Sequence, residues 1–155
     1  MRKQLIKVSL ILAAAALAAF GADNTLGTWK LNVEKSKYTP APFPIKSLTT
    51  IREAADGGVK ITSTGVQADG TPINSSSTIK YDGKEYPITG APWDTSSIKQ
   101  VDANTLTSTN TQKNAKYHVT NRTVISKDGK TMTTTSKGTN AEGKPVTATL
   151  VYDKQ

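Results

Sequence analysis

The sequence predicts an all-β fold, an antiparallel meander of about eight to ten strands that forms a closed or nearly closed barrel. Threonine and serine are abundant along the chain, and the branched Cβ of threonine suits a pleated strand. Asp-Gly pairs recur between these β-type segments, and such a pair is a strong signal for a tight hairpin turn. No stretch of ten or more residues shows the apolar spacing of a helix. Short turns make successive strands antiparallel neighbours, and a long meander protects its edges by closing into a barrel or folding over as two sheets.

The chain begins with a segment, residues 1–21, that is predicted to be an export signal. Basic residues occur at positions 2, 3 and 7, and residues 8–20 are an apolar run that is shorter than the about 20 residues of a membrane-spanning helix. Small residues precede the expected cleavage point after Gly21. We therefore expect a single barrel domain over residues 22–155 that works in the periplasm or as a secreted protein, with no stable membrane insertion after cleavage near Gly21.

Turn signals divide the rest of the chain into strands. They are Asp56-Gly57-Gly58, Asp69-Gly70, Asp82-Gly83, Asp102-Ala103-Asn104, Asp128-Gly129 and Glu142-Gly143. Around them we predict strands near residues 27–33, 46–53, 59–67, 72–81, 85–89, 97–101, 105–111, 117–126, 131–138 and 144–152. A pattern G-x-x-A-[DE]-G-x-P-[IV] occurs at residues 65–73 and again at 138–146, which predicts two equivalent hairpins.

Two segments are predicted to be loops. Residues 34–45 contain Pro40, Pro42 and Pro44, and alternating prolines exclude both helix and regular sheet. We expect a fixed loop there, crossing one end of the barrel. The second loop, residues 89–94, carries Trp93, one of two tryptophans in the chain.

The composition argues against several classes of site. The formal charge is +8, but the lysines are spread along the chain without an arginine-rich stripe, so we expect a solvated basic surface and no nucleic-acid partner. The chain has no cysteine and one histidine, which leaves too few ligands for a transition-metal site. We therefore expect no disulfide, no metal and no cofactor.

Both ends of the predicted domain carry residues that resemble the calycins. Gly27-Thr28-Trp29-Lys30-Leu31 resembles the Gly-x-Trp of the first lipocalin strand, and Leu150-Val151-Tyr152-Asp153-Lys154 resembles the Arg-x-Tyr-Glu-Lys that ends fatty-acid-binding proteins. The chain beyond the signal also resembles a group of small exported bacterial lipocalin-like proteins of unassigned function, through residues 35–37, 81–90 and 126–130. These resemblances imply a calycin-like barrel that binds a small apolar or amphipathic molecule.

One departure from that resemblance concerns ligand chemistry. Leu150 stands where fatty-acid-binding proteins place the arginine that holds the ligand carboxylate. We therefore expect no carboxylate-anchored mode, and we expect neutral ligands to compete well with free fatty acids. Arg52 or Arg122 facing inward would reverse this expectation.

Candidate ligand-binding residues are of two kinds. Period-two alternation places small polar side chains between apolar ones on the inward faces of several strands. They are either the rim of a small hydrated cavity or side chains that simply fit a narrow barrel, with their hydroxyl groups bonded to backbone or to each other. These polar candidates are Ser63, Ser75, Ser77, Asn121 and Thr123.

Aromatic residues near loops form the second group of candidates. Tyr38, Tyr86 and Trp93 either offer a stacking surface for a ligand at the barrel mouth or plug that end. Trp29 shares a strand face with Leu31, and we assign it a structural role at the barrel end.

No residue is predicted to be catalytic. His118, on the opposite strand face from the inward set, has no partner visible in the sequence, and no nucleophile elbow or nucleotide-binding loop is present. We expect a non-catalytic, monomeric binding protein with a small apolar or amphipathic partner. The alternative is an envelope or extracellular protein-interaction module with a solid barrel and no ligand cavity.

Overall fold

Ten antiparallel strands make up the architecture, which a computed structural model describes over residues 22–155. The predicted signal in residues 1–21 and its cleavage lie outside the described residues. Each strand pairs with its neighbour in sequence except β4 and β5, which are the two edges of the sheet, and β1 also pairs with β10, so the prediction of an all-β antiparallel meander is confirmed. The strands are β1 (Gly27–Thr39), β2 (Ile45–Ala55), β3 (Gly58–Gln67), β4 (Pro72–Lys80), β5 (Tyr86–Pro87), β6 (Thr95–Asp102), β7 (Thr105–Thr111), β8 (His118–Ile125), β9 (Thr131–Thr139) and β10 (Pro145–Lys154).

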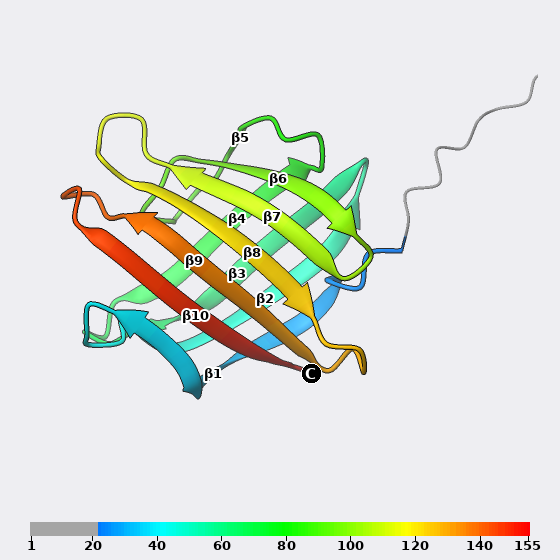
Figure 1. Cartoon of the computed structure of the whole chain (residues 1–155), viewed down its shortest axis with the longest axis horizontal. Helices are drawn as coiled ribbons and strands as arrows, with labels where there is room; N and C mark the ends of the chain where they lie inside the picture. The colour runs from blue at the N-terminus through cyan, green and yellow to red at the C-terminus, as the bar shows by residue number, and fades with distance from the viewer. Residues whose placement is uncertain (1–21) are drawn as a thin grey trace, which may run out of the picture.

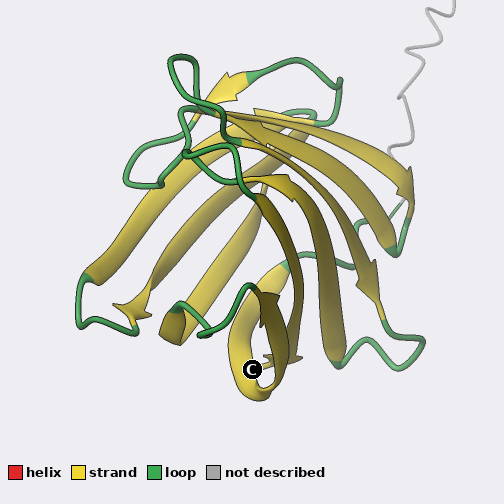
Figure 2. Cartoon of the chain, turned by 60° about the vertical axis from the view of Figure 1, so that its left-hand side comes forward, coloured by secondary structure: helices red, strands yellow, loops and turns green. Residues whose placement is uncertain are grey.

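The sheet curls until its two edge strands meet. The order runs from β4 through β1 and β10 to β5, and in Figure 1 the strands β7–β10 cross in front of β2–β4. Ser76 of β4 and Thr89, just after β5, exchange two backbone hydrogen bonds of 3.1 Å, and the Ser77 hydroxyl donates to the Pro87 carbonyl at 2.7 Å. The result is a nearly closed, calycin-like barrel, whose curved sheet Figure 2 shows from the side. Among residues 22–155 there is no helix long and apolar enough to cross a membrane.

The first strand corrects one prediction. Residues 34–39, expected to be loop, continue β1 as far as Thr39, and the prolines follow it. The register with β10 shifts between Asn32 and Lys37, so the strand passes through a bulge. The Ser36 hydroxyl supports the bulge, because it donates to the Asn32 carbonyl at 2.7 Å and accepts the Val151 N–H at 3.0 Å.

Apolar packing is concentrated at one end of the barrel, where β1 starts and β10 ends. One cluster there joins Trp29, Leu31, Ile125, Met132 and Tyr152, and a second joins Val59, Ile79, Ile98 and Leu106. We call this the packed end.

Trp29 anchors the packed end and is fully buried. Its Nε1 donates to the Thr25 carbonyl at 2.8 Å, and Lys154 Nζ lies 5.1 Å from the ring centroid. This contact ties the start of β1 to the end of β10, the two segments that carry the calycin-like residues.

Candidate ligand-binding site

The barrel interior is hollow beyond the packed end. A cavity of about 500 Å³ is lined by residues of β1–β4 and β7–β10 and by the loop that follows β5. Loop residues such as Pro44 and Asn140 belong to the lining, which places the mouth at the end formed by the β1–β2, β3–β4, β7–β8 and β9–β10 connections. These connections lie on the left in Figure 1.

The structure brings six of the eight predicted ligand-binding residues into this lining. The six are Tyr38, Ser63, Ser75, Trp93, Asn121 and Thr123. Five of them come from the strands β1, β3, β4 and β8, where period-two alternation brings them to one side of the sheet, and Trp93 comes from the loop after β5. Their part in binding a ligand remains a prediction.

Ser77 and Tyr86 are not in the cavity lining. Ser77 is buried, and its hydroxyl donates to Pro87 at the seam between β4 and β5. Tyr86 packs against the cluster that contains Val59, and its hydroxyl donates to Asp82 at 2.8 Å. Both residues therefore help to close the barrel, a role that a strand pattern does not reveal because it depends on how the sheet edges meet.

The polar residues of the wall bond to each other across neighbouring strands. Thr50 and Ser63 hydroxyl oxygens lie 3.0 Å apart, and those of Thr123 and Thr134 lie 2.9 Å apart. The Asn121 amide donates to the Ser108 hydroxyl at 3.1 Å. These groups satisfy one another inside the barrel, so the wall does not require water at every hydroxyl.

Apolar side chains share the wall with these polar pairs. The lining includes Leu48, Ile73, Val119, Met132 and Leu150. The cavity therefore offers apolar surface with interspersed polar groups, a surface suited to an amphipathic molecule.

The mouth carries a pair of stacked aromatic rings. Trp93 and Tyr117 have centroids 5.6 Å apart and an interplanar angle of 17°, and both line the cavity. Burial raises the pKa of the Tyr117 hydroxyl to about 12. The Trp93 Nε1 is buried and has no hydrogen-bond partner among residues 22–155. The aromatic pair forms part of the cavity wall near the mouth, and the indole N–H of Trp93 makes no hydrogen bond with the described residues.

Arg52 is the principal residue of the cavity wall that was not among the predicted ligand-binding residues. It lies on β2 in the cavity lining and is 9% exposed. Its Nε donates to the Thr25 hydroxyl at 3.2 Å, while Nη2 is buried without a hydrogen-bond partner in the described part of the chain, residues 22–155. Leu48, Thr50 and Arg52 share one strand face, so the alternation of β2 contained the signal.

Two tyrosines lie close to Arg52. Burial raises the pKa of Tyr152 to about 12, and burial together with a hydrogen bond to Asp23 raises the pKa of Tyr81 to about 12. The positive charge of Arg52 opposes both shifts, because it favours the phenolate form. The cavity therefore ends at a buried cation beside phenol groups.

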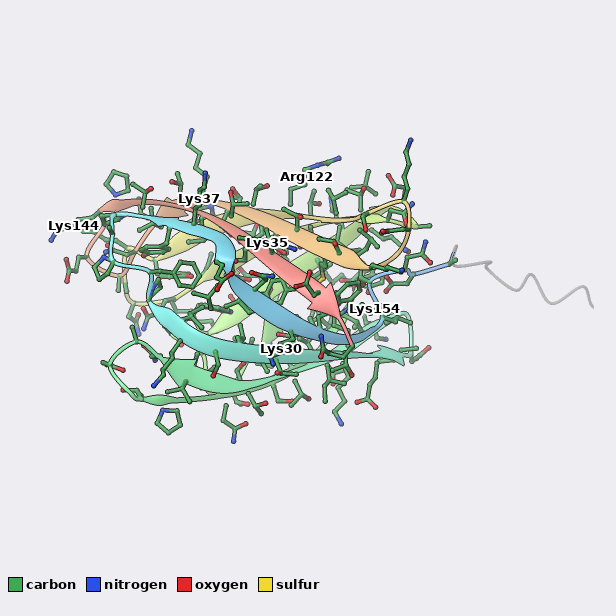
Figure 3. All side chains as sticks on the ribbon, turned by 90° about the horizontal axis from the view of Figure 1, so that it is seen from below. Lys30, Lys35, Lys37, Arg122, Lys144 and Lys154 are labelled. Atoms are coloured by element: carbon green, nitrogen blue, oxygen red, sulfur yellow. The ribbon has the colours of Figure 1, made fainter. Side chains whose placement is uncertain are left out.

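The outer surface carries the other basic side chains. Arg122 points away from the barrel in Figure 3, together with exposed lysines of β1 and β10. His118 is exposed at the start of β8. No group of histidine, cysteine or acidic residues within residues 22–155 is arranged to hold a metal ion.

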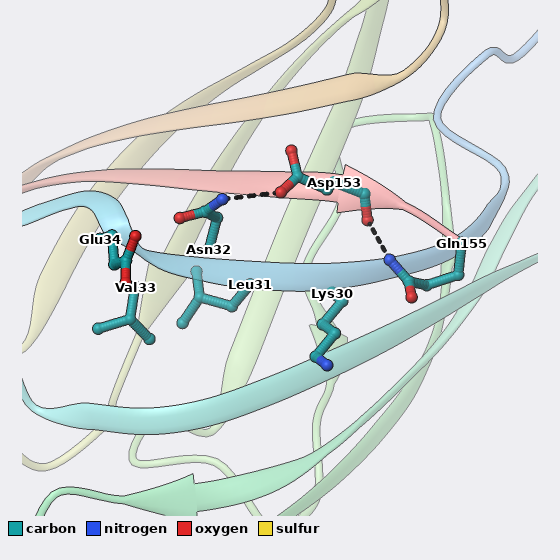
Figure 4. A pocket seen from close by; sticks show the side chains of 7 residues that line it. All are labelled: Lys30, Leu31, Asn32, Val33, Glu34, Asp153 and Gln155. Atoms are coloured by element: carbon teal, nitrogen blue, oxygen red, sulfur yellow. Dashed lines mark hydrogen bonds between the residues drawn. The ribbon is translucent and has the colours of Figure 1, made fainter.

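A smaller hollow of about 360 Å³ lies along β1 and the end of β10 (Figure 4). Asn32 donates to Asp153 there at 2.8 Å, and Gln155 donates to the Asp153 carbonyl at 3.1 Å. Lys30, Glu34 and Gln155 in its wall are exposed. The barrel cavity is therefore the better enclosed of the two.

Comparison with known proteins shows likeness of fold. No protein-family model and no curated protein matches the chain. A solved structure of a protein of unknown function from the DUF3598 family of Nostoc punctiforme is 17% identical, with a TM-score of 0.54, over 85% of this chain and 47% of that one. The chain thus spans about half the length of that protein. The zebrafish ileal bile acid-binding protein, solved with cholic acid, is 16% identical, with a TM-score of 0.49, over 86% of this chain and 100% of that one.

Proposed function

We propose that this protein binds a small apolar or amphipathic molecule inside the barrel and does no chemistry on it. The cavity of about 500 Å³ carries the proposal. Ligand sites in proteins typically have volumes of about 300–1,000 Å³ and mostly apolar walls with a few polar groups. The alternative, an interaction module with a solid barrel, requires an interior filled by side chains. The cavity of about 500 Å³ argues against it.

The arrangement of the wall supports binding without catalysis. The polar groups deep in the barrel bond to one another in pairs, such as Thr123 with Thr134, instead of forming a nucleophile with a base. His118, the single histidine of the chain, lies outside the barrel.

The test is to fill the cavity and measure binding. Ala148 lies in the wall, and Ala148→Phe places a large side chain in the cavity without removing a polar group. Thr135, exposed on β9, gives the control Thr135→Phe, which adds the same ring to the outer face. We expect a neutral fluorescent naphthylamine probe to bind the wild type and Thr135→Phe, and to bind Ala148→Phe at least about tenfold more weakly. Equal binding by all three proteins would place the probe outside the barrel.

We further propose that the protein works after export, in the periplasm or as a secreted protein. The basic start and short apolar run of residues 1–21 support this. The intact mass of the exported protein is the test, because a mass that retains residues 1–21 contradicts cleavage near Gly21.

A further inference from the structure

The inner end of the cavity carries a positive charge, which bears on the chemistry of the ligand. Arg52 is part of the cavity wall and is nine-tenths buried. We propose that the ligand is an amphipathic carboxylate whose head group binds Arg52 and whose apolar body lies along the cavity toward Trp93. This inference rests on the proposed function, because it names the class of molecule that the cavity takes.

Arg52 has no ion-pair partner within residues 22–155, where the ion pairs lie on the surface. Its Nε donates to the Thr25 hydroxyl, and its Nη2 has no partner although it is buried. A buried donor without an acceptor destabilises a protein, and more so when the donor is charged. A ligand carboxylate in the cavity supplies the missing negative charge, and a small shift of the planar guanidinium toward the cavity gives Nη2 an acceptor as well.

Asp23 is linked to Arg52 through Thr25, but both oxygens of its carboxylate already accept hydrogen bonds from other groups. Asp23 Oδ1 accepts the backbone N–H and the hydroxyl of Thr25, at 2.9 and 2.6 Å. Asp23 Oδ2 accepts the hydroxyl of Tyr81. Arg52 is thus linked to Asp23 through Thr25, without direct contact, and its charge remains available to a molecule in the cavity.

The rest of the cavity suits the apolar body of such a molecule. Met132, Leu150 and Leu48 line the wall between Arg52 and the mouth, and Trp93 lies at the mouth. The wall along β10 from Thr147 to Tyr152 is about 17 Å long at roughly 3.4 Å per residue. A medium-length alkyl chain fits this space with its head group inward.

This proposal differs from the expectation drawn from Leu150, and the experiment below decides between them. That residue does lie in the cavity wall and offers no charge. Arg52 supplies a cation to the same cavity from β2, on a different part of the sheet. Carboxylate preference therefore depends on a residue that the end motif does not include.

A structural role for Arg52, as a tether between β2 and Thr25, is the competing explanation. The two roles differ in what they do to ligand preference. A tether affects binding of an acid and its ester equally, whereas an anion site favours the acid. The ratio of the two affinities, measured on one folded protein, separates these roles.

The experiment measures dissociation constants of dodecanoic acid and its methyl ester by displacement of a neutral fluorescent probe. For the wild type we expect the acid to bind about tenfold to a hundredfold tighter than the ester. Arg52→Gln should bring this ratio close to one, and Arg52→Lys, which keeps the charge but loses the planar fork, should leave it in between. Arg122→Gln, exposed on β8, is the matched control and should keep the wild-type ratio.

Each outcome decides the matter. If the ester binds the wild type as tightly as the acid, the inference is wrong and the proposed function stands. If neither molecule binds, both are wrong. A wild-type ratio that survives in both Arg52 variants also overturns the inference. If Arg52→Gln does not fold, the wild-type ratio and Arg52→Lys still decide.

Discussion

Tyr152 couples folding to pH through its burial in the wall of the cavity. Burial raises the pKa of its hydroxyl from the usual 10.0 to about 12. The folded state therefore holds the proton more tightly than the unfolded state. The stabilisation is complete below pH 10 and is lost as the pH rises through the folded pKa of about 12.

We predict that the free energy of unfolding of the wild type falls between pH 10 and about pH 12. Tyr152→Phe removes one ionisable group from the wall. Over the same pH interval, the free energy of unfolding of this variant should fall by roughly 1–3 kcal/mol less than that of the wild type. Tyr81 and Tyr117, whose pKa values are also raised to about 12, should keep a smaller dependence in that variant. Urea denaturation across this range is the measurement, and parallel curves for the two proteins would contradict the assignment.

The positions of single residues could be predicted from the sequence where strand alternation decides whether a side chain faces the barrel interior. Strand period two placed Asn121 and Thr123 inward, and both line the cavity. The same rule applied to β2 would have placed Arg52 inward, but a lone arginine on a strand is ordinarily assigned to the surface. What could not be read from the sequence is that Arg52 forms no ion pair with the described residues 22–155, which depends on contacts between β2 and the segment before β1.

The β1 bulge shows how one hydroxyl group can hold an element in place. Ser36 accepts the N–H of Val151 where the register between β1 and β10 shifts. Without that acceptor the N–H loses a partner in a half-buried position.

We predict that Ser36→Ala lowers the free energy of unfolding by about 1–3 kcal/mol, because it leaves this donor unpaired. Ser47, exposed on β2, is the control, and Ser47→Ala should change stability by less than about 0.5 kcal/mol. Chemical denaturation of the three proteins gives both values. Equal, small effects would mean that the hydroxyl of Ser36 does not support the bulge.

The seam between β4 and β5 depends on a close backbone contact at Gly90. Its φ is +73°, and a Cβ added there would lie 1.9 Å from the Asn74 carbonyl oxygen. Gly129 has nearly the same φ, +71°, but a Cβ there would meet nothing within 4 Å. An alanine would therefore meet the same backbone strain at both positions, but only at Gly90 would it also collide with the backbone of Asn74.

We predict that Gly129→Ala costs about 1–2 kcal/mol of stability, the penalty for a left-handed conformation. Gly90→Ala should cost about 1–3 kcal/mol more, because the seam must also move. Hydrogen exchange at the amides of Ser76 and Thr89 should accelerate in Gly90→Ala alone. Similar losses in both variants, with unchanged exchange, would contradict a tight seam.

Strands and turns were the most predictable elements. The ten predicted strands all occur, and the repeated pattern forms equivalent hairpin turns, in which Gln67 bonds to Thr71 and Asn140 bonds to Lys144. The extension of β1 to Thr39 was not predicted, because the prolines that exclude regular sheet begin only at Pro40, after the strand has ended. Closure of the barrel was predicted, but the residues that form the seam were not, because the edge strands meet through tertiary structure and no local sequence pattern records that contact.

At the scale of the whole molecule, the barrel divides into a packed end and a hollow part. The two clusters of buried apolar side chains, Trp29 among them, gather where β1 begins, and small polar side chains share the wall of the remainder with apolar ones. The sequence showed these small residues but left open whether they accompany a cavity or a narrow barrel. Only the summed volume of side chains from eight strands and a loop settles that, and the sum leaves about 500 Å³ free.

The most direct test of a hollow, ligand-binding barrel is a crystal structure of residues 22–155 grown with dodecanoic acid. We expect one elongated molecule inside the barrel, with its carboxylate at Arg52 and its chain running past Leu150 toward Trp93. An interior that excludes the molecule, with side chains closing the space or the acid bound only on the outer surface, would contradict the central claim.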